Sequence, residues 1–383
     1  MHCMWSPKSK LVILIAVSLI ISIIFLTWCI LPYDYSNIPR TTHCDNILKN
    51  ETKYLLFPMF TIISGSGLGN QLFEIFSLLG MAEKLNRTAI FNKRDWFLNF
   101  RLKNVREKIP KIAENVRSMD IEVRFRLNMK IQTVLITLKS DKLNNTNTSK
   151  VTPSNSMRYI NSPACCEYNF PHVLYCEQSK FVVIDGRYFQ SFKYFENFES
   201  EIRGFFVPSG LEMVEVDSMI SFDDLSKFKN CVHIRRGDFV TDGQHAGSDP
   251  EFTRNAIEYI YEKNPGPIFI FSNEQNWVKQ EISKKSKLKN EIRIMPTPKE
   301  KPFKDLYFSQ KYCNSVLITA PSSTFGWWLG YLSKNQTNVY FRDIREVEDS
   351  VKYQMIDDDF FPAKWNKLGM MSNNGTIFLK KNV

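Results

Sequence analysis

Short apolar segments alternate with amphipathic segments along the second half of the chain, and this alternation constrains the fold more than any other feature. The strand-like segments come at 232–234, 268–271, 292–294, 316–318 and 338–340. The helix-like segments fall between them at 250–263, 274–286, 303–313 and 323–333. A strand-helix-strand repeat joins parallel strands, so the pattern predicts a parallel sheet covered by helices on both faces. Ligands of such sheets bind at the carboxyl ends of the strands.

An equivalent unit is expected earlier in the chain. A buried strand is predicted at 59–63, followed by a helix with apolar residues at helical spacing over 72–82 and a second strand at 89–91. A further strand is predicted at 181–185. We therefore predict an α/β protein of two facing, doubly wound, Rossmann-like domains, with a C-terminal tail. The expected ranges are 58–225, 226–345 and, for the tail, 346–383.

The first forty residues predict attachment to a membrane. No charged residue occurs over 11–33, and 23 residues of helix span about 35 Å, enough for a tilted bilayer crossing. Lys8 and Lys10 precede this run, so the positive-inside bias predicts a cytosolic tail at 1–10, a signal-anchor at 11–33 and a lumenal remainder. A polar stem is expected at 34–57. A cleaved signal peptide is the alternative, although its apolar core would be shorter and would end in small residues.

Sequons and cysteines agree with a lumenal location. Asn-x-Ser/Thr sequons begin at Asn50, Asn86, Asn144, Asn147, Asn335 and Asn374. Six cysteines follow the apolar run, and an even number permits disulfides in an oxidising compartment. We expect Cys176 to pair with Cys165 or Cys166. Cys231 and Cys313 lie in apolar segments, where buried thiols are the alternative.

The charge distribution is uneven. The chain has 50 Lys and Arg against 40 Asp and Glu, and residues 93–150 hold 14 of the former against 6 of the latter. We interpret 93–150 as a basic helical insertion, either a solvated surface or a contact for an acidic glycan or an anionic membrane. A lumenal location makes nucleic acid an unexpected partner. The five histidines are too scattered to indicate a zinc site.

The strongest local motif is His233-Ile234-Arg235-Arg236-Gly237-Asp238, which continues an apolar strand-like segment. Guanidinium groups bind two phosphate oxygens at once and stay charged, so Arg235 and Arg236 indicate an anionic ligand at the end of the strand. Gly237 would let the backbone approach that ligand closely. The alternatives are an arginine pair that only marks the solvent end of a strand and an Arg-Gly-Asp adhesion tripeptide.

A glycine-rich loop, SGSGLGNQ at 64–71, joins the first predicted strand to its helix. Backbone N–H groups and the helix dipole at such a junction form an anion site, although the glycine spacing differs from the dinucleotide fingerprint. Asn70 and Gln71 add hydrogen-bonding side chains that suit a neutral polyol such as a sugar. A tight turn with close helix packing is the alternative.

A third block, SSTFGWW at 322–328, again follows a strand and opens a helix. Its hydroxyl groups can bind phosphate or cap the helix. Trp327 and Trp328 are alternatively explained by packing in the core.

An acidic triplet, Asp357-Asp358-Asp359, offers an Asp-x-Asp pattern that can hold Mn²⁺ or Mg²⁺ with the phosphates of a ligand. No clear strand leads into it, so we expect a solvated turn there and no metal site.

Three blocks in order, GLGNQLF (67–73), HIRRGDF (233–239) and SSTFGWW (322–328), resemble the Golgi α-1,2-fucosyltransferase family. The family's intermediate blocks are similar to this chain at 185–195, 249–260 and 270–278, and at Cys313. The whole chain resembles a divergent member. The His-x-Arg-Arg box alone also occurs in α-1,6- and protein O-fucosyltransferases, so it indicates the donor rather than the linkage.

The resemblance implies GDP-fucose as the donor, a GT-B fold, and inversion at the sugar carbon without a metal or other cofactor. By position, Arg235 matches the arginine on the donor diphosphate, and Asp238 closes the same catalytic box. The donor-binding positions are His233, Arg235, Arg236, Ser323, Thr324 and Phe325. The positions of the loop that faces the cleft are Gly67, Gly69, Asn70 and Gln71. The N-terminal domain would hold the acceptor and the C-terminal domain the donor.

We therefore predict a single-pass, type II Golgi membrane protein that transfers L-fucose from GDP-fucose to a glycan hydroxyl, with position 2 of a galactose as the expected acceptor. The hydroxyl must lose its proton, and Asp238, Glu74 and Asp249 are the candidate bases. The alternative functions are a non-catalytic glycan- or nucleotide-binding relative and a fucosyltransferase of another linkage.

Overall fold

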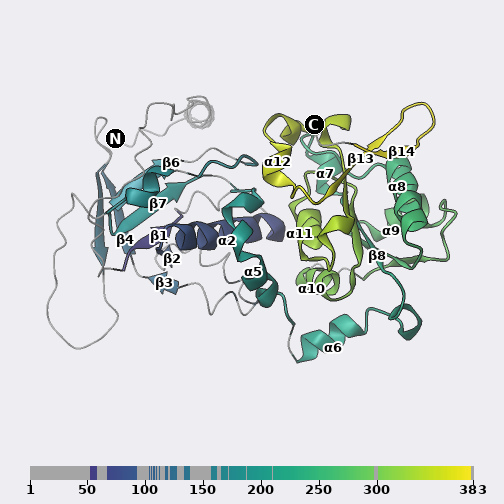
Figure 1. The fold of residues 1–383 in the computed structure, drawn as a ribbon, viewed down its shortest axis with the longest axis horizontal. Coiled ribbons are helices and arrows are strands. Elements are labelled where there is room, and N and C mark those ends of the chain that lie inside the picture. The colour runs from purple at the N-terminus through teal and green to yellow at the C-terminus, as the bar shows by residue number, and fades with distance from the viewer. Residues whose placement is uncertain are drawn as a thin grey trace, which may run out of the picture. The chain divides into compact units, whose positions relative to one another are not determined.

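A computed structural model describes most of the chain from Thr52 onward (Figure 1). The described ranges are 52–57, 67–92, 117–119, 121–126, 133–138, 157–161, 165–170, 172–186, 188–208, 210–296 and 301–380, with single positions between 103 and 112. The predicted cytosolic tail, the signal-anchor, most of the stem and the strand expected at 59–63 lie outside these residues. Among the residues that are described, no helix combines the length and the apolar character that crossing a bilayer requires.

The first sheet has five parallel strands in the order β3-β2-β1-β7-β6. They are β1 (Tyr54–Leu56), β2 (Thr88–Asn92), β3 (Arg117–Met119), β6 (Met157–Asn161) and β7 (Phe181–Asp185). Helix α2 (Leu68–Lys84) lies between β1 and β2 in the chain and buries most of its apolar side chains. Strand β1 falls inside the range predicted as stem.

The helical interpretation of the basic insertion is wrong for its described strands. Strands β4 (Ile121–Arg126) and β5 (Thr133–Leu138) form an antiparallel hairpin, and β3 extends the first sheet. The sequence of β4, IEVRFR, alternates apolar and charged residues with a period of two, which is typical of a strand.

The second sheet has seven strands in the order β10-β9-β8-β11-β12-β13-β14. They are β8 (Asn230–Ile234), β9 (Ile268–Ser272), β10 (Ile292–Ile294), β11 (Ser315–Ile318), β12 (Val339–Arg342), β13 (Asn366–Met370) and β14 (Ile377–Leu379). All neighbours are parallel except β13 and β14. Counted from β8, the parallel strands follow the order 3-2-1-4-5-6 of a doubly wound fold. The predicted strands are confirmed, but the range expected to be a tail supplies β13 and β14.

Helices cover both faces of this sheet, as predicted (Figure 1). Because side chains alternate along a strand, Val232 and Ile234 pack with α8 (Pro250–Lys263) and with the π-helix η6 (Val278–Ser283) on one face. On the other face lie α10 (Phe303–Tyr312), which packs Phe308 on Phe269, and α11 (Thr324–Leu332). The remaining helices are α5 (Glu199–Phe205), α6 (Leu211–Asp217), α7 (Asp238–Thr241), α9 (Gln275–Trp277) and α12 (Asp357–Phe360). The 3₁₀ turns are His172–Cys176, Phe192–Tyr194, Glu196–Phe198, Phe222–Asp224, Gln336–Asn338, Ile344–Glu346 and Ser350–Tyr353.

The start of α8 matches its sequence signal. Asp249 Oδ1 accepts a 2.7 Å hydrogen bond from the backbone N–H of Phe252, and Pro250 occupies the first helical position. This capping arrangement satisfies a donor that the first turn of a helix cannot pair internally.

The expected cysteine pairing is wrong. Cys165 is bonded to its neighbour Cys166, and Cys176 forms a disulfide with neither of them. Cys231 and Cys313 are bonded to each other with their Cα atoms 5.7 Å apart, so they are not buried thiols. The reason is the strand order, because Cys231 lies on β8 and Cys313 lies just before its neighbour β11.

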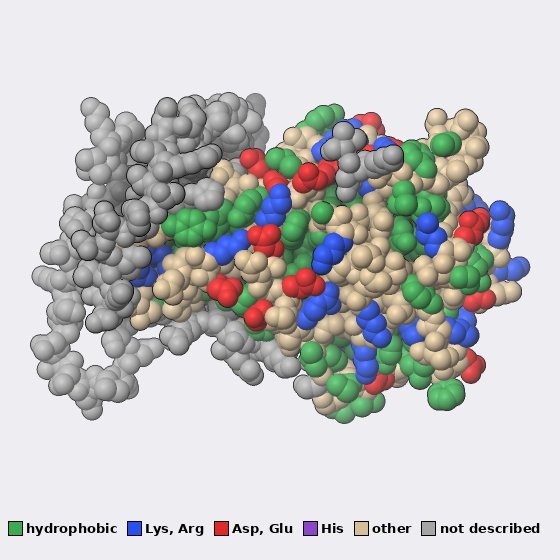
Figure 2. All heavy atoms as spheres, in the orientation of Figure 1, with side chains coloured by type: hydrophobic (Ala, Val, Ile, Leu, Met, Phe, Trp, Pro, Cys, Tyr) green, Lys and Arg blue, Asp and Glu red, His purple; other side chains and the backbone are tan. Residues whose placement is uncertain are grey.

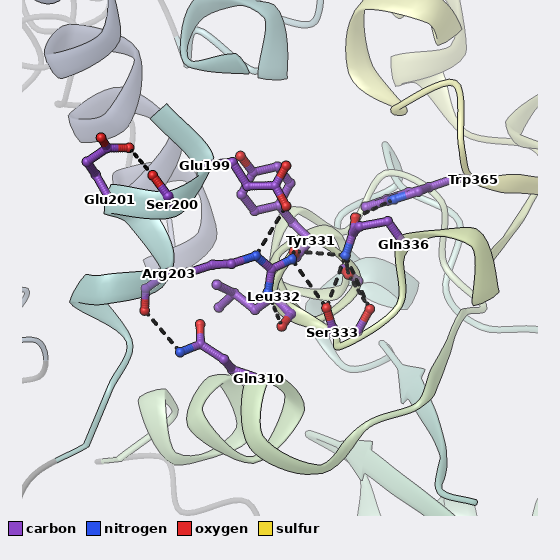
Figure 3. Close-up of polar contacts among 11 residues, drawn as sticks. Glu199, Ser200, Glu201, Arg203, Gln310, Tyr331, Leu332, Ser333, Gln336 and Trp365 are labelled. Atoms are coloured by element: carbon purple, nitrogen blue, oxygen red, sulfur yellow. Dashed lines mark hydrogen bonds and ion pairs between the residues drawn. The ribbon is translucent and has the colours of Figure 1, made fainter. Parts of the chain in front are cut away.

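An arginine clamp joins the segment after the first sheet to the second sheet (Figure 3). Arg203 on α5 donates from Nη1 to the carbonyl oxygen of Leu332 (2.8 Å) and from Nη2 to those of Tyr331 (2.7 Å) and Ser333 (3.2 Å). These are carbonyls at the end of α11, which have no partner within the helix. Glu199 Oε1 accepts from Arg203 Nε at 3.1 Å and so orients the guanidinium.

The surface carries both signs of charge. Figure 2 shows Lys and Arg side chains interspersed with Asp and Glu over the described residues on one face. Asn86, Asn335 and Asn374 are exposed, as a sequon requires, and Asn50, Asn144 and Asn147 lie outside the described residues. Whether the exposed sequons are glycosylated remains a prediction.

Candidate active site

The loops that follow β8 and β11 meet at the centre of the second sheet. The chain winds from β8 toward β9 and from β11 toward β12, so the strand order reverses between these two neighbours. His233 lies level with Ile318 across the pair, and Thr319 donates from its backbone N (3.2 Å) and its Oγ1 (2.8 Å) to the His233 carbonyl oxygen. Doubly wound sheets bind ligands at such a reversal. The structure therefore brings the arginine motif and the serine-rich block together there.

Arg235 stands at the carboxyl end of β8 and is partly exposed. Its Nη2 donates to Asp238 Oδ2 at 2.7 Å, and its guanidinium carbon lies 5.3 Å from the centre of the Phe239 ring. Its Nε is buried and has no hydrogen-bond partner among the described residues. Because buried donors are normally paired, Arg235 retains a donor for an anionic ligand.

Arg236 differs from Arg235, because its side chain is engaged by the protein. Its Nη1 donates to the Ser248 carbonyl oxygen at 2.8 Å, and its guanidinium carbon lies 4.2 Å from the Trp277 ring centre. The backbone of Arg236 exchanges two hydrogen bonds with the Asn273 side chain, of 3.0 and 3.2 Å. Gly237 follows with φ +61° and passes so close to Asn273 that a Cβ would lie 2.8 Å from its Nδ2.

The His233 side chain on β8 packs against Gly326 of α11. Its ring is buried, and a Cβ at Gly326 would lie 2.5 Å from its Nδ1, so only glycine lets α11 approach this closely. Burial, and then the charge of Arg235, lowers the pKa of His233 to about 3. The imidazole is therefore neutral near pH 7, and it contributes packing to the site rather than charge.

Two side chains fix the loops on either side of the reversal. Ser248 Oγ lies 2.6 Å from Thr319 Oγ1, and Ser248 N donates to the Arg235 carbonyl oxygen at 2.8 Å. Asp349 Oδ2 accepts from Ser322 Oγ at 2.6 Å and from the backbone N of Ala246 at 3.0 Å. These bonds hold the loop after α7 against the loop after β11.

The serine-rich block caps α11 and packs its tryptophans inside. Ser323 Oγ accepts from Gly326 N at 3.4 Å, and Thr324 Oγ1 donates to Asn70 Oδ1 at 2.6 Å. Both tryptophans are fully buried, which confirms the core-packing alternative for them. The two hydroxyls predicted to contact the donor are thus engaged within the protein, while the start of α11 still directs its dipole toward the reversal point. Phe325 lies beside His233, with ring centres 5.9 Å apart.

Gly69, in the first turn of α2, also meets the start of α11. A Cβ at Gly69 would lie 2.7 Å from Phe325 N, and Trp328 Nε1 donates to the Gly69 carbonyl oxygen at 2.9 Å. Close helix packing therefore explains Gly69. Gly67 has open space around it, and Gln71 is partly buried.

The three carboxylates proposed as bases occupy different environments. Asp238 is ion-paired with Arg235, and Asp249 caps α8. Glu74 is only 2% exposed. Buried or structurally engaged carboxylates are poor candidates for taking a proton from an incoming hydroxyl, so this part of the expectation gains no support.

The acidic triplet is not a solvated turn. Asp357 pairs with Arg345 (3.0 Å) and Lys367 (2.7 Å), and Asp359 is buried with Lys193 at 2.6 Å. Lysine and arginine side chains from neighbouring segments pair with these carboxylates in the short helix α12. The sequence around the triplet does not indicate these ion pairs.

The sequence does not predict one pair of polar side chains near the arginines, Asp242 and His245. Asp242 Oδ2 lies 2.6 Å from His245 Nδ1, and the His245 ring stacks on Phe239 with centres 4.3 Å apart. The only sequence signal is a carboxylate three residues before a histidine in a glycine-containing loop, and that spacing is common in loops without function.

These features define a Rossmann-type α/β protein with two arginines and the N-terminus of a helix at its topological switch point. Residues 177–368 match the family described as glycosyl transferase family 11. The chain belongs to glycosyl transferase family 11, and it is a glycosyltransferase. The resemblance predicted from the three sequence blocks is thereby confirmed.

Relatives in Caenorhabditis elegans support this assignment. The chain is 46% identical over 368 residues to a galactoside 2-alpha-L-fucosyltransferase, covering 96% of this chain and 95% of the relative. It is 33% identical over 344 residues to another protein of the same name, covering 83% and 78%. A solved structure of NodZ alpha-1,6-fucosyltransferase soaked with GDP-fucose covers 87% of this chain and 100% of its own at 11% identity. The TM-score of this match is 0.38.

Proposed function

We propose that this chain is a galactoside 2-alpha-L-fucosyltransferase that moves L-fucose from GDP-fucose to a galactose hydroxyl. The observation that carries the proposal is the position of Arg235, a guanidinium with an unused donor among the described residues, at the switch point of a family 11 sheet. The 46% identical relative of that name supports the choice of sugar and linkage.

The chemistry needs positive charge where the diphosphate leaves. As the sugar–phosphate bond breaks, negative charge builds on GDP and positive charge on the sugar ring. Arg235 and the N-terminal turn of α11 both favour the negative charge, and they are held in place before the reaction begins. Arg236 contributes a second positive charge from its fixed position on Trp277. The acceptor oxygen attacks from the opposite side, so the sugar carbon inverts.

We also propose a metal-independent reaction in a GT-B arrangement, with the acceptor on the side of the first sheet. The cationic groups at the switch point support this, since they can balance the diphosphate charge themselves. The triplet 357–359, the metal-binding pattern that the sequence offered, has two of its carboxylates in ion pairs with lysine and arginine. Transfer that persists in excess EDTA is the expected result.

We propose further that the protein is a type II membrane protein of the Golgi, with its catalytic part in the lumen. The uncharged run at 11–33, preceded by lysines, supports this topology. The Cys231–Cys313 disulfide supports an oxidising compartment. Protease protection of the chain in sealed microsomes, with the tail at 1–10 accessible, is the test.

The test of activity uses the full chain with labelled GDP-fucose and a panel of galactose-terminated glycans. We expect a fucosylated product whose linkage analysis gives α-1,2. Transfer to another hydroxyl would support a fucosyltransferase of another linkage. GDP binding without transfer to any acceptor would instead support a non-catalytic relative.

A further inference from the structure

We propose that His245 is the general base that takes the proton from the acceptor hydroxyl, and that Asp242 positions its ring. This inference deepens the proposed function and rests on it. It replaces the carboxylate bases expected from the sequence.

The Asp242 carboxylate is fixed before it meets the histidine. Its Oδ1 accepts hydrogen bonds from the backbone N–H groups of Gln244 (2.8 Å) and His245 (3.0 Å), and its Oδ2 lies 2.6 Å from His245 Nδ1. Partial burial favours the neutral acid, but these hydrogen bonds from His245 and Gln244 outweigh it and lower the pKa of Asp242 to about 2. An ionised carboxylate accepts a hydrogen bond from Nδ1–H, so the lone pair of the neutral ring is on Nε2.

The His245 ring is close to the group that would hold the leaving diphosphate. Its face stacks on Phe239 with ring centres 4.3 Å apart and an interplanar angle of 20°. The Arg235 guanidinium carbon lies 5.3 Å from the centre of the same ring. A base and a leaving-group arginine must flank one reacting carbon, and here both groups contact the same phenylalanine.

The loop that carries His245 is anchored on both sides while the ring stays accessible. The Ala246 N–H bonds to Asp349, and the Gln244 carbonyl oxygen accepts from Ser350 N at 2.8 Å. The His245 side chain is nevertheless 28% exposed, so a hydroxyl from solvent can reach it. Charged groups from the packed segments around it are Arg235 on the β8 end, Asp238 and Asp242 at α7, and Asp349 beyond β12.

The step balances in atoms and charge. The acceptor O–H proton moves to His245 Nε2 as that oxygen forms a bond to the fucose anomeric carbon. The bond from that carbon to the β-phosphate oxygen breaks, and its electron pair leaves with GDP. The imidazolium that results is stabilised by Asp242 and releases its proton to solvent before the next turnover.

The experiment compares transfer kinetics and GDP affinity for the full chain and its variants. His245→Asn keeps an N–H where Nδ1 was and removes Nε2, so kcat should fall at least 100-fold while the Kd for GDP stays within threefold. The acidic limb of the wild-type kcat profile should disappear. His245→Gln is a second variant in case the first does not fold, and Lys287→Gln, in the exposed pair with Glu258, is the control.

Asp242→Asn tests the positioning role. Its kcat should fall about tenfold with little change in KM, and the double variant with His245→Asn should be no slower than His245→Asn alone. Multiplying losses would contradict a shared role. If the wild-type chain transfers fucose and folded His245→Asn and His245→Gln keep kcat within threefold with the same pH profile, the base assignment falls and the proposed function stands. A wild-type chain that binds GDP without transferring fucose overturns both.

Discussion

Thr324 Oγ1 donates a 2.6 Å hydrogen bond to Asn70 Oδ1, and so joins the first turns of two helices that are 254 residues apart. Asn70 Oδ1 also accepts from Gln190 Nε2 at 3.0 Å. The first turn of α2 and the first turn of α11 therefore form one junction between the two sheets. Residues that the sequence suggests as ligand contacts hold this junction together.

Substitution of Gly69 tests how tightly that junction is packed. A Cβ at Gly69 would lie 2.7 Å from the backbone of Thr324 and Phe325, which cannot move aside like the end of a side chain. We expect Gly69→Ala to lower the free energy of unfolding by about 1–3 kcal/mol. Gly67→Ala is the matched control, because nothing lies within 4 Å of its Cβ position. Equal urea midpoints for the two variants would contradict the close packing.

Removal of the Arg235 side chain tests the leaving-group role. We expect folded Arg235→Ala to lose at least a factor of 100 in kcat, because one preorganised donor to a developing oxyanion contributes about 3–4 kcal/mol. Arg235→Lys should recover only part of this, since an ammonium cannot make the forked contact of a guanidinium. Fucose transfer and GDP affinity are measured together. Near-normal turnover by folded Arg235→Ala would exclude this residue from the reaction.

A buried neutral histidine makes stability depend on pH in a defined direction. The pKa of His233 is about 3 in the folded chain against 6.5 for an ordinary histidine. As pH falls from 6.5 toward 3, the unfolded chain takes up a proton that the folded chain refuses, so the free energy of unfolding decreases. Between pH 7 and pH 5 this residue should account for about 2 kcal/mol.

The check compares urea denaturation of the wild type and His233→Asn at pH 7 and pH 5. The variant should lack this part of the decrease, although it is less stable at both pH values. If the two proteins lost the same free energy between pH 7 and pH 5, the histidine would not be buried in its neutral form.

The sequence predicts the second sheet well, for physical reasons. The segments at β9 and β11 contain continuous apolar runs, and β8 is apolar apart from Asn230 and His233, as expected of strands buried on both faces. Asp249-Pro250 marks the start of α8. Strand β13 (NKLGM) escapes prediction because it is only partly apolar, and β14 (IFL) escapes it because it is only three residues long. Their pairing depends on the edge that β12 presents, which is a property of the assembled sheet.

The candidate site is likewise predictable from the sequence only in part. The meeting of Arg235 with the loop after β11 follows from parallel strand order, which the alternation of segments implies. The contacts of the Arg236 side chain with Trp277 and Ser248 cannot be predicted from the sequence, because they depend on where α9 and the loop that contains Ser248 lie. The stack of His245 on Phe239 is likewise set by the path of a loop, for which residue periodicity gives no signal.

The disulfide between Cys231 and Cys313 cross-links the centre of the second sheet. It closes a loop of 82 residues between two neighbouring central strands. We expect a Cys231→Ala, Cys313→Ala double variant to lose about 2–5 kcal/mol of unfolding free energy, because the cross-link restricts the unfolded chain. Peptide mapping without reduction should find the two cysteines in one linked fragment. Separate fragments would contradict the pairing.

Arg203 closes the end of α11 with three carbonyl contacts (Figure 3). Arg203→Met keeps the length of the side chain but removes the donor to the Leu332 carbonyl oxygen, while Gln336 Nε2 still donates to those of Tyr331 (3.0 Å) and Ser333 (3.2 Å). Because hydrogen bonds to a charged group contribute about 1.5–3 kcal/mol, we expect a loss of at least 2 kcal/mol in the free energy of unfolding. Lys285→Met is the matched control, since solvent screens its exposed ion pair with Glu281. Chemical denaturation measures both variants, and a loss for Arg203→Met no larger than that of Lys285→Met would show that the clamp does not hold α5 to the second sheet.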